Sequence, residues 1–371
     1  MTRKLLCIWI VLTLVTALAG CADEKTANTG QPITTVTFFD VGQADCALIE
    51  YEGSHILIDA GNNADGTNLC RPLQQKKITT IDILVGTHPH EDHIGGLDDV
   101  IETFQIQKLY LPKVKDSLIP TTQTYEDVLD AAAKKGLTVS SFERGQPVWQ
   151  KGNASFTFLG PVRDDYDNLN EYSLICRLDA GKTSFLFMGD AEAKNEEELL
   201  ESGAEVKADV LKVGHHGSQT SSGNAFLKAV NPQYAVISCG IFNEYGHPSN
   251  EVLLRLMRLK TKIVRTDEQS SIVFTTNGEE LTFDCEETLE PTKQSHTGAS
   301  SIRAFSSIPA DSSSAAIASS SNEIMVQTVY KTETGKSYHK QDCSYLTDSA
   351  IPLTLEEAKT QGLAPCKRCF G

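Results

Sequence analysis

The stretch that most constrains this chain is Thr-His-Pro-His-Glu-Asp-His-Ile-Gly-Gly at residues 87–96. The 371 residues include nine histidines, and three of them lie here, directly after apolar residues 81–85 that are typical of a buried strand. Alternate residues of an extended segment project to the same side, so His88 and His90 can bind one ion. Asp92 and His93, at the following turn, can bind a second. Imidazole and carboxylate ligands suit zinc, manganese or iron, and the stretch therefore predicts a metal site in a loop.

The rest of residues 32–285 alternates between strand and helix signals. Residues 33–39, 46–51 and 55–59 are rich in β-branched and aromatic residues and predict strands. Apolar residues at helical spacing predict helices at 96–104, 125–135, 195–202 and 250–259. Further strands are expected at 81–85, 137–142, 155–159, 173–178, 184–188, 209–213, 234–238, 262–265 and 271–276. Because the strands are too many for one parallel sheet, we expect an α/β fold with two sheets flanked by helices.

Five blocks of this region resemble one known family. The histidine stretch resembles the HxHxDH signature of the metallo-β-lactamase fold. The text at residues 38–61, 185–192, 209–222 and 245–253 is similar to the branch typified by the hydrolase domain of the DNA-uptake protein ComEC. The resemblance implies an αββα sandwich with metal ions held by loops at one edge of the two sheets. It also implies hydrolysis by a metal-activated hydroxide, because such an ion lowers the pKa of a bound water from about 16 towards about 7.

The resemblance implies roles for individual residues. Asp190, in Phe-Met-Gly-Asp, matches the acid that bridges two ions, and Asp59 matches the acid that orients a histidine from behind the site. Asp92 and Asp190 are also expected to be catalytic. The implied metal ligands are His88, His90, Asp92, His93, Asp190 and His216.

The neighbouring histidines His215 and His216 share one further role. Neighbours on an extended segment point apart, so only one of them is expected to bind metal. By similarity to related esterases, His216 is the expected ligand, while His215 is the expected substrate contact or catalytic proton donor. His247 matches a further block of this branch and is expected to reach the substrate.

The sequence departs from the family at one place. Members with a full two-metal site have another histidine between the HxHxDH loop and the later aspartate, and residues 94–214 contain none. The ComEC branch shows asparagine and serine there, which makes Asn168, Asn170 and Ser173 candidates, with Asn170 and Ser173 expected at the substrate. The first ion is then expected to bind weakly, to be completed by amide, water or substrate, or to be a harder ion such as manganese.

The N-terminal segment predicts export. Arg3 and Lys4 precede an apolar run at residues 5–19, which is typical of a signal peptide covering residues 1–20. The run closes on a stretch that resembles the bacterial lipobox, so Cys21 is the expected lipid attachment point at the extracellular face of the membrane; an ordinary secretory signal is the alternative. Residues 21–31 are polar and small and predict a tether. Without residues 1–20 the chain has 31 basic and 49 acidic residues, formally −18, which argues against a broad nucleic-acid footprint.

The C-terminal part predicts a linker and a small module. Residues 286–324 are rich in Ser, Thr and Ala and cannot bury enough apolar surface to fold. Residues 325–371 follow, in which one histidine and three cysteines form an HxxxC and a CxxC pair that predict a structural zinc ion. A disulfide is the alternative. The module resembles the N-terminal domain of the Ada repair protein. The four predicted zinc ligands are His339, Cys343, Cys366 and Cys369.

The remaining polar and sulfur-containing residues are weaker signals. Asp40, Gln43 and Asp45 are explained by a turn about as well as by a role at the metal loop. Five cysteines of the main domain show no disulfide pattern, although export would permit one or two bridges. They are Cys46, Cys70, Cys176, Cys239 and Cys285.

The sequence thus predicts an exported, lipid-anchored hydrolase with one or two divalent ions, Zn or Mn, acting on phosphodiester bonds, with DNA as the leading substrate by resemblance. One alternative is a surface hydrolase of phosphorylcholine or another small phosphoester or ester. Another is a binding module that has lost turnover. The expected partners are the substrate and, through Cys21, the membrane. The sequence indicates no protein partner.

Overall fold

The computed structural model describes residues 32–285 and, in the tail, residues 328–331, 337–339, 351–354, 358 and 363–366. The predicted signal peptide, Cys21, the tether and the linker at 286–324 lie outside the described residues. Of the predicted tail ligands, Cys343, Cys369 and the side chain of His339 also lie outside them. The predictions made for these parts therefore stay predictions.

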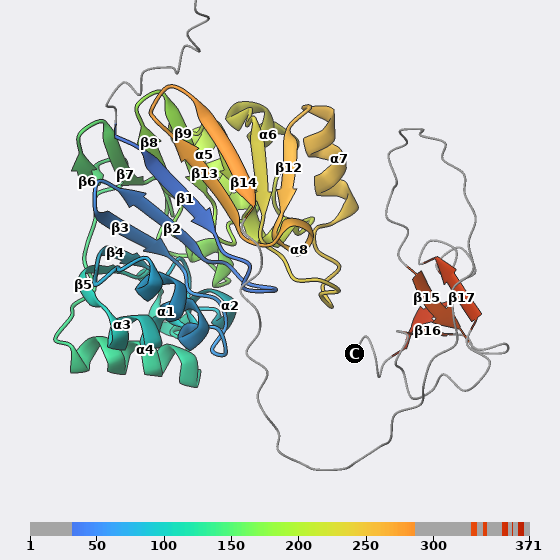
Figure 1. Cartoon of the computed structure of the whole chain (residues 1–371), viewed down its shortest axis with the longest axis horizontal. Helices are drawn as coiled ribbons and strands as arrows, with labels where there is room; N and C mark the ends of the chain where they lie inside the picture. The colour runs from blue at the N-terminus through green and yellow to red at the C-terminus, as the bar shows by residue number, and fades with distance from the viewer. Residues whose placement is uncertain are drawn as a thin grey trace, which may run out of the picture.

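Residues 32–285 contain two mixed sheets that pack face to face (Figure 1). The first has the order β14-β13-β1-β2-β3-β4-β5, with β3, β4 and β5 parallel and the remaining neighbours antiparallel. Its strands are β1 Thr34–Phe38, β2 Ala47–Tyr51, β3 Ser54–Ile58, β4 Thr80–Val85, β5 Gln105–Tyr110, β13 Ile272–Thr276 and β14 Leu281–Cys285.

The second sheet has the order β12-β11-β10-β9-β8-β7-β6. Strands β9 to β12 are parallel, and β6 to β9 form an antiparallel meander. Its strands are β6 Pro147–Lys151, β7 Ala154–Phe158, β8 Cys176–Ala180, β9 Thr183–Phe187, β10 Val210–Lys212, β11 Tyr234–Ile237 and β12 Lys262–Arg265.

Helices cover the outer face of each sheet. Helices α1 Gly66–Gln75, α3 Leu97–Thr103 and α4 Gln123–Lys134 pack on the first sheet, and α5 Ala193–Glu201, α6 Asn224–Val230 and α7 Asn250–Arg258 pack on the second. Between the sheets lies an aromatic core, in which Phe38 stacks on Phe187 at a centroid distance of 5.7 Å. Burying each such ring stabilises the fold by about 2–3 kcal/mol. The predicted αββα sandwich is confirmed.

Several elements differ from the sequence prediction. Residues 137–142 form only an isolated bridge between Val139 and Leu109 rather than a strand. Helix α1 was missed because Pro72 interrupts its helical signal. Strand β5 was missed because its exposed and buried residues do not alternate regularly. Strands β6 and β14 and helix α6 were also missed, whereas the strands and helices around the histidine stretch lie close to their expected positions.

In the tail, strands β15 Thr328–Lys331, β16 Ser337–His339, β17 Ile351–Thr354 and β18 Ala364–Pro365 pair in the order β17-β15-β16-β18. Tyr338 and Ala358 are buried at its centre. Cys366, a predicted zinc ligand, is buried, and its backbone N–H donates to Tyr338 O at 2.9 Å. In the part of the chain that the structure describes, none of the helices combines the length and apolar character needed to cross a bilayer.

Candidate metal centre

Asp59 fixes the loop that follows β4. Its two carboxylate oxygens accept hydrogen bonds from Thr87 N at 2.7 Å and Thr87 Oγ1 at 2.8 Å. One of them, Oδ2, also lies 2.8 Å from His93 Nδ1. Because Asp59 binds Nδ1 of His93, the Nε2 atom of the same ring faces away from Asp59 and toward Asp190. Asp59 therefore sets both the ring orientation and the tautomer of His93.

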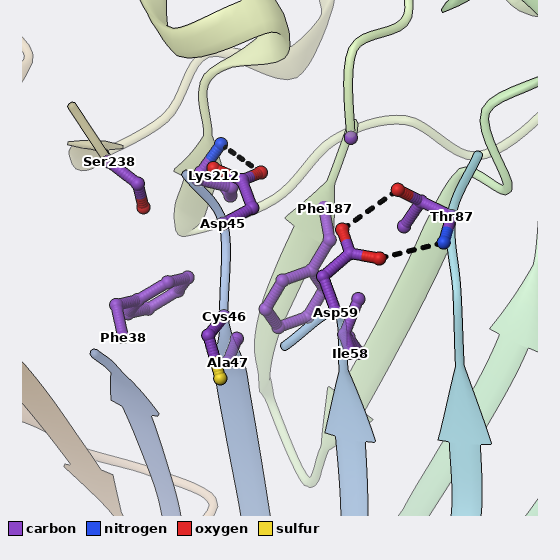
Figure 2. A pocket seen from close by; sticks show the side chains of 11 residues that line it. Phe38, Asp45, Cys46, Ala47, Ile58, Asp59, Thr87, Phe187, Lys212 and Ser238 are labelled. Carbon is purple, nitrogen blue, oxygen red and sulfur yellow. Dashed lines mark hydrogen bonds and ion pairs between the residues drawn. The ribbon is translucent and has the colours of Figure 1, made fainter. Parts of the chain in front are cut away.

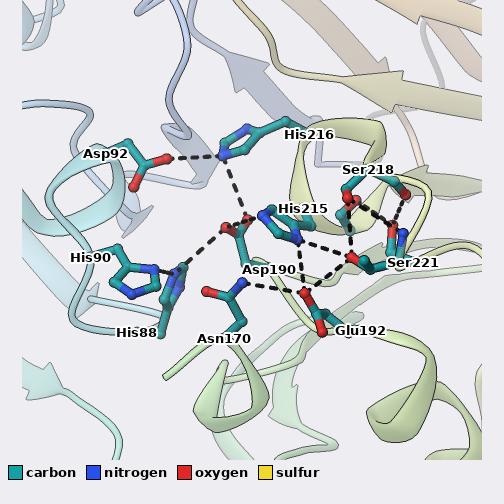
Figure 3. Close-up of polar contacts among 12 residues, drawn as sticks. His88, His90, Asp92, Asn170, Asp190, Glu192, His215, His216, Ser218 and Ser221 are labelled. Atoms are coloured by element: carbon teal, nitrogen blue, oxygen red, sulfur yellow. Dashed lines mark hydrogen bonds and ion pairs between the residues drawn. The ribbon is translucent and has the colours of Figure 1, made fainter. Parts of the chain in front are cut away.

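The predicted ligands form two adjoining clusters, and Figure 3 labels all of them except His93. His88, His90 and Asp190 make one, and their potential ligand atoms lie within 4.8 Å of one another, as do those of the second cluster. Asp190 belongs to both, with Oδ2 3.7 Å from His88 Nε2 and Oδ1 3.2 Å from His93 Nε2. The second cluster consists of Asp92, His93, Asp190 and His216.

Two buried atoms of the second cluster fit a cation between them. His93 Nε2 and Asp190 Oδ1 are both inaccessible to solvent and lie 3.2 Å apart, but within the described part of the chain neither atom has a hydrogen bond of good geometry. Buried polar atoms without such bonds cost free energy, and a divalent ion coordinated by both would remove that cost. Imidazole nitrogen and carboxylate oxygen are ligands for zinc, manganese and iron. The residues present therefore fit a site for one or two such ions.

The charges within the clusters are balanced between acids and imidazoles. Burial favours the neutral acid at Asp190, but the imidazoles of His93 and His216 outweigh it and hold the pKa of that carboxyl well below its usual range. Burial disfavours the imidazolium of His216, but the carboxylates of Asp190 and Asp45 outweigh it and raise the pKa of His216 to about 10. Burial is the main reason that the pKa of His88 lies well below its usual value. A bound cation would take the place of the proton on His216.

Asp190 follows β9 through Gly189, whose φ of +53° is in the left-handed region. The backbone N–H of Asp190 donates to Ser173 Oγ at 3.1 Å. Ser173 is fully buried, and its hydroxyl supports the acid that joins the two clusters. That Ser173 contacts the substrate stays a prediction.

The sequence reasoning assumed that His215 and His216 lie on an extended segment, but they do not. Both residues have positive φ, 49° and 51°, in the tight turn η3 Gly214–Gly217. His216 Nδ1 lies 2.9 Å from Ser238 O, and its Nε2 lies 3.2 Å from Asp92 Oδ2. His215 lies at the solvent side of the cluster, with 23% of its side chain exposed and its Nε2 3.7 Å from Asp190 Oδ2. The turn therefore places His216 in the cluster and His215 at its edge.

Glu192 is a site residue that the sequence reasoning missed. Its Oε1 lies 3.1 Å from His215 Nδ1 and accepts hydrogen bonds from Thr220 Oγ1 at 3.0 Å and Asn170 Nδ2 at 3.4 Å. The second amide atom of Asn170, Oδ1, is buried without a hydrogen-bond partner among the described residues. Asn168, the other candidate, lies away from the clusters and accepts the N–H of Glu171. Glu192 lies two residues after Asp190, and this closeness in the sequence was the signal that could have identified it.

The clusters open into a cleft of about 590 Å³. This size suits a small ligand or a short segment of a polymer. His247 lies at the wall of the cleft, where burial and the nearby His216 and His215 lower its pKa to about 4. Two acids, Glu91 and Glu244, line the mouth. The full lining is Gln43, Asn62, His90, Glu91, Asp92, Asn170, Asp190, His215, His216, Glu244, Tyr245 and His247.

A buried ion pair lies beneath the clusters (Figure 2). Asp45 Oδ2 is 2.6 Å from Lys212 Nζ, and Asp45 Oδ1 is 3.3 Å from His216 Nδ1. Asp45 is therefore not simply a polar residue of a turn, because it is buried and contacts a predicted metal ligand.

The sequence left open whether the five main-domain cysteines pair. Four of them are buried free thiols: Cys46, Cys70, Cys176 and Cys239.

Comparison with known proteins places this geometry in a family. A sequence model of the Metallo-beta-lactamase superfamily matches residues 39–241. The chain is 32% identical over 257 residues to ComE operon protein 3 of Bacillus subtilis (strain 168), which covers 64% of this chain and 32% of that protein. It is 31% identical over 270 residues to Competence protein ComA of Neisseria gonorrhoeae, which covers 72% of this chain and 35% of that protein.

The chain therefore spans about one third of the length of these curated relatives. Among solved structures, the metallo-beta-lactamase fold protein YhfI from Bacillus subtilis aligns with a TM-score of 0.44 and 14% sequence identity. That alignment covers 66% of this chain and 100% of YhfI.

Proposed function

This chain belongs to the metallo-beta-lactamase superfamily, and we propose that it is a metal-dependent phosphodiesterase that cleaves DNA outside the cell. The observation that carries the proposal is the position of Asp190. Its carboxylate faces His88 on one side and His93 on the other, and its Oδ1 is buried without a hydrogen-bond partner among the described residues. An acid so placed can hold two cations side by side at the floor of an open cleft.

The proposed mechanism divides the work among the side chains of the chain. His88, His90 and Asp190 would hold one ion, and Asp92, His93, Asp190 and His216 would hold the other. Bound divalent ions of this kind supply Lewis acidity and hydroxide at neutral pH. His215, at the edge of the clusters, has its Nδ1 on Glu192, which leaves Nε2 to contact a substrate oxygen or donate a proton to the leaving group.

DNA as the substrate is part of the proposal. It is supported by the similarity to a protein named as a competence protein, of which this chain spans only about a third. Export, a lipid on Cys21 and a zinc ion held by the four tail residues His339, Cys343, Cys366 and Cys369 belong to the same proposal. A hydrolase held at the outer face of the membrane would meet DNA before uptake.

A second candidate is a hydrolase of a small phosphoester such as a phosphorylcholine ester. The observation that favours it is the pair of acids at the mouth of the cleft, Glu91 and Glu244, which repel a polyanion more than a substrate with one phosphate and a cationic head. The formal net charge of −16 acts in the same direction.

The deciding experiment measures metal content and hydrolysis together. The purified protein is assayed on bis-p-nitrophenyl phosphate, a single-stranded oligonucleotide and p-nitrophenyl phosphorylcholine. Asp190→Asn is the disabled variant, and Asp116→Asn, an exposed aspartate outside the cleft, is the matched control. Cleavage of the oligonucleotide by the wild type and the control, but not by Asp190→Asn, supports the proposal. Turnover of phosphorylcholine ester alone would select the second candidate, and protein without bound metal or turnover would contradict both.

A further inference from the structure

Three aromatic rings form a ladder that leads from the metal clusters to the surface. The ring of His247 is nearly parallel to that of His216, with a centroid distance of 6.3 Å and an angle of 24°. Tyr245 continues the series beyond His247, at 5.7 Å and 22°. His216 is 2% exposed whereas Tyr245 is 66% exposed, so the ladder begins inside the cluster and ends in solvent. Tyr245 also lines the cleft.

The loop that carries Tyr245 has an unusual surface. Ile241 is 65% exposed and Phe242 is 59% exposed, so with Tyr245 three large apolar residues are exposed within five positions, and Tyr245 among them lines the cleft. Single exposed apolar residues need no explanation, but a group of them at the rim of a site indicates a binding surface. Glu244 lies within the same loop and lines the same cleft.

The loop is held in place although its rings are exposed. Asn243 Nδ2 donates to the carbonyl oxygens of Gly240 at 3.0 Å and His247 at 2.6 Å, and Asn243 Oδ1 accepts the N–H of His247 at 2.9 Å. Gln43 Oε1 accepts the N–H of Gly240 at 3.0 Å, which ties the loop to the segment between β1 and β2. A surface fixed by its backbone in this way loses little conformational freedom when it binds a ligand.

We propose that Tyr245 forms a stacking subsite for a nucleobase of the strand whose phosphodiester bond lies at the metal clusters. This inference rests on the proposed function and adds to it the form of the substrate. One face of the Tyr245 ring packs on His247, and the exposed face extends the ladder for one more ring. Every base has a face that stacks on an aromatic side chain, so such a subsite accepts single strands with little regard to sequence.

The charges of the loop favour a base over the other ligands of an apolar surface. Glu244 directly precedes Tyr245 and repels phosphates, so the contact made by the Tyr245 ring is with an uncharged base rather than with the backbone. The same acid disfavours insertion of the loop into an anionic membrane surface. Bases in a duplex are already stacked on one another, so the subsite predicts a preference for single-stranded DNA.

The test compares oligo-dT with an oligonucleotide of equal length whose residues are all abasic, because the two share a backbone charge and differ in bases. Wild-type protein is expected to show a kcat/KM ratio of roughly 5- to 160-fold in favour of oligo-dT, the range of one base stacked on an aromatic ring. Tyr245→Ala should bring the ratio close to one, and Tyr245→Phe should restore it. Met257→Ala, an exposed apolar residue of α7 that does not line the cleft, is the matched control and should keep the wild-type ratio.

Three results would overturn the subsite. The first is a wild-type ratio near one while both oligonucleotides are cleaved, which would leave the proposed phosphodiesterase standing without a base contact. The second is an unchanged ratio in Tyr245→Ala. The third is a loss of the base preference in Tyr245→Ala that Tyr245→Phe does not restore, which would mean that the aromatic ring is not what contacts the base. Cleavage of neither oligonucleotide by the metal-loaded wild type would overturn the proposed function, and the subsite with it.

Discussion

Lys212 Nζ lies 2.6 Å from Asp45 Oδ2, and the two side chains are 4% and 7% exposed. Asp45 is in the segment between β1 and β2, and Lys212 ends β10, so the ion pair joins the two sheets directly beneath the metal clusters (Figure 2). Burial alone would raise the pKa of Asp45, but the charges of Lys212 and His216 outweigh it and hold the pKa below its usual range. The carboxylate is therefore charged inside the core, and Lys212 is its direct cationic partner.

Removing one partner of this pair should be costly. Lys212→Met leaves the Asp45 carboxylate buried without its cation and is expected to lower the free energy of unfolding by about 3 kcal/mol, measured by urea denaturation. Adding Asp45→Asn should recover part of the loss, because no buried charge then remains. Lys182→Met is the control, since the Lys182–Glu279 pair is exposed and is expected to change stability by less than about 1 kcal/mol. Equal effects of the two lysine substitutions would refute the role of burial.

The shared position of Asp190 predicts how metal content responds to substitution. His90→Ala removes a ligand from one cluster only, and His216→Ala removes one from the other, so each variant is expected to lose about one ion of two. Asp190→Asn weakens both clusters and should lose more metal than either. Elemental analysis of the purified variants, after dialysis against a fixed free-metal concentration, makes the comparison. Equal and complete loss in all three variants would instead indicate a single site.

Most of the candidate metal ligands could be predicted from the sequence because they lie in short motifs. His88, His90 and His93 follow one buried strand, and the spacing alone predicted a metal site in the loop after it. Asp190 lies about a hundred residues further along the chain, and only the family resemblance connected it to that loop. The layered fold could also be predicted, because buried strands and amphipathic helices each leave a periodic pattern of apolar residues in the sequence.

Several residues have roles that the sequence did not reveal, because they act through contacts between distant segments. Ser173 was named because the ComEC branch shows asparagine and serine at that place, and the resemblance did not reveal that the N–H of Asp190 donates to its hydroxyl inside the core. Glu192 belongs to the site only because the turn at His215 brings an imidazole to within 3.1 Å of it. Asp45 resembled a turn residue until Lys212, from the other sheet, was placed beside it. No local pattern encodes a pair of residues that meet across two sheets.

Asp59 should control metal affinity without binding metal. Asp59→Asn keeps the size of the side chain but replaces a carboxylate that holds His93 Nδ1 at 2.8 Å, so the ring is no longer fixed with Nε2 toward the cluster. Loss of such a support typically weakens metal binding by about 10- to 100-fold, which competition with a chromophoric chelator can measure. Asp82→Asn is a suitable control, because Asp82 accepts the N–H of His55 on neighbouring β3 and lies away from the clusters. Equal affinities of Asp59→Asn and wild type would contradict this role.

Glu196 on α5 should give the protein a pH-dependent stability of definite sign. The side chain is almost fully buried, and burial raises its pKa to about 7 although the N–H groups of Gly223 and Ser222 and the charge of Arg255 act against the rise. The native state thus binds a proton that the unfolded state, with a pKa near 4.5, has released. Stability from this group is fully present below pH 4.5 and is lost as the pH rises through about 7.

The slope can reach about 1.4 kcal/mol per pH unit in that window, and comparison of wild type with Glu196→Gln isolates it. In urea titrations at several pH values with a chelator present, the difference in unfolding free energy between wild type and variant should fall as the pH rises from 4.5 to 7. Glu197→Gln, an exposed neighbour on the same helix, should leave the pH dependence as it is in the wild type. A difference between wild type and Glu196→Gln that is constant across the window would mean that Glu196 is charged in the native state. The two backbone N–H groups would then stabilise its carboxylate by more than burial costs.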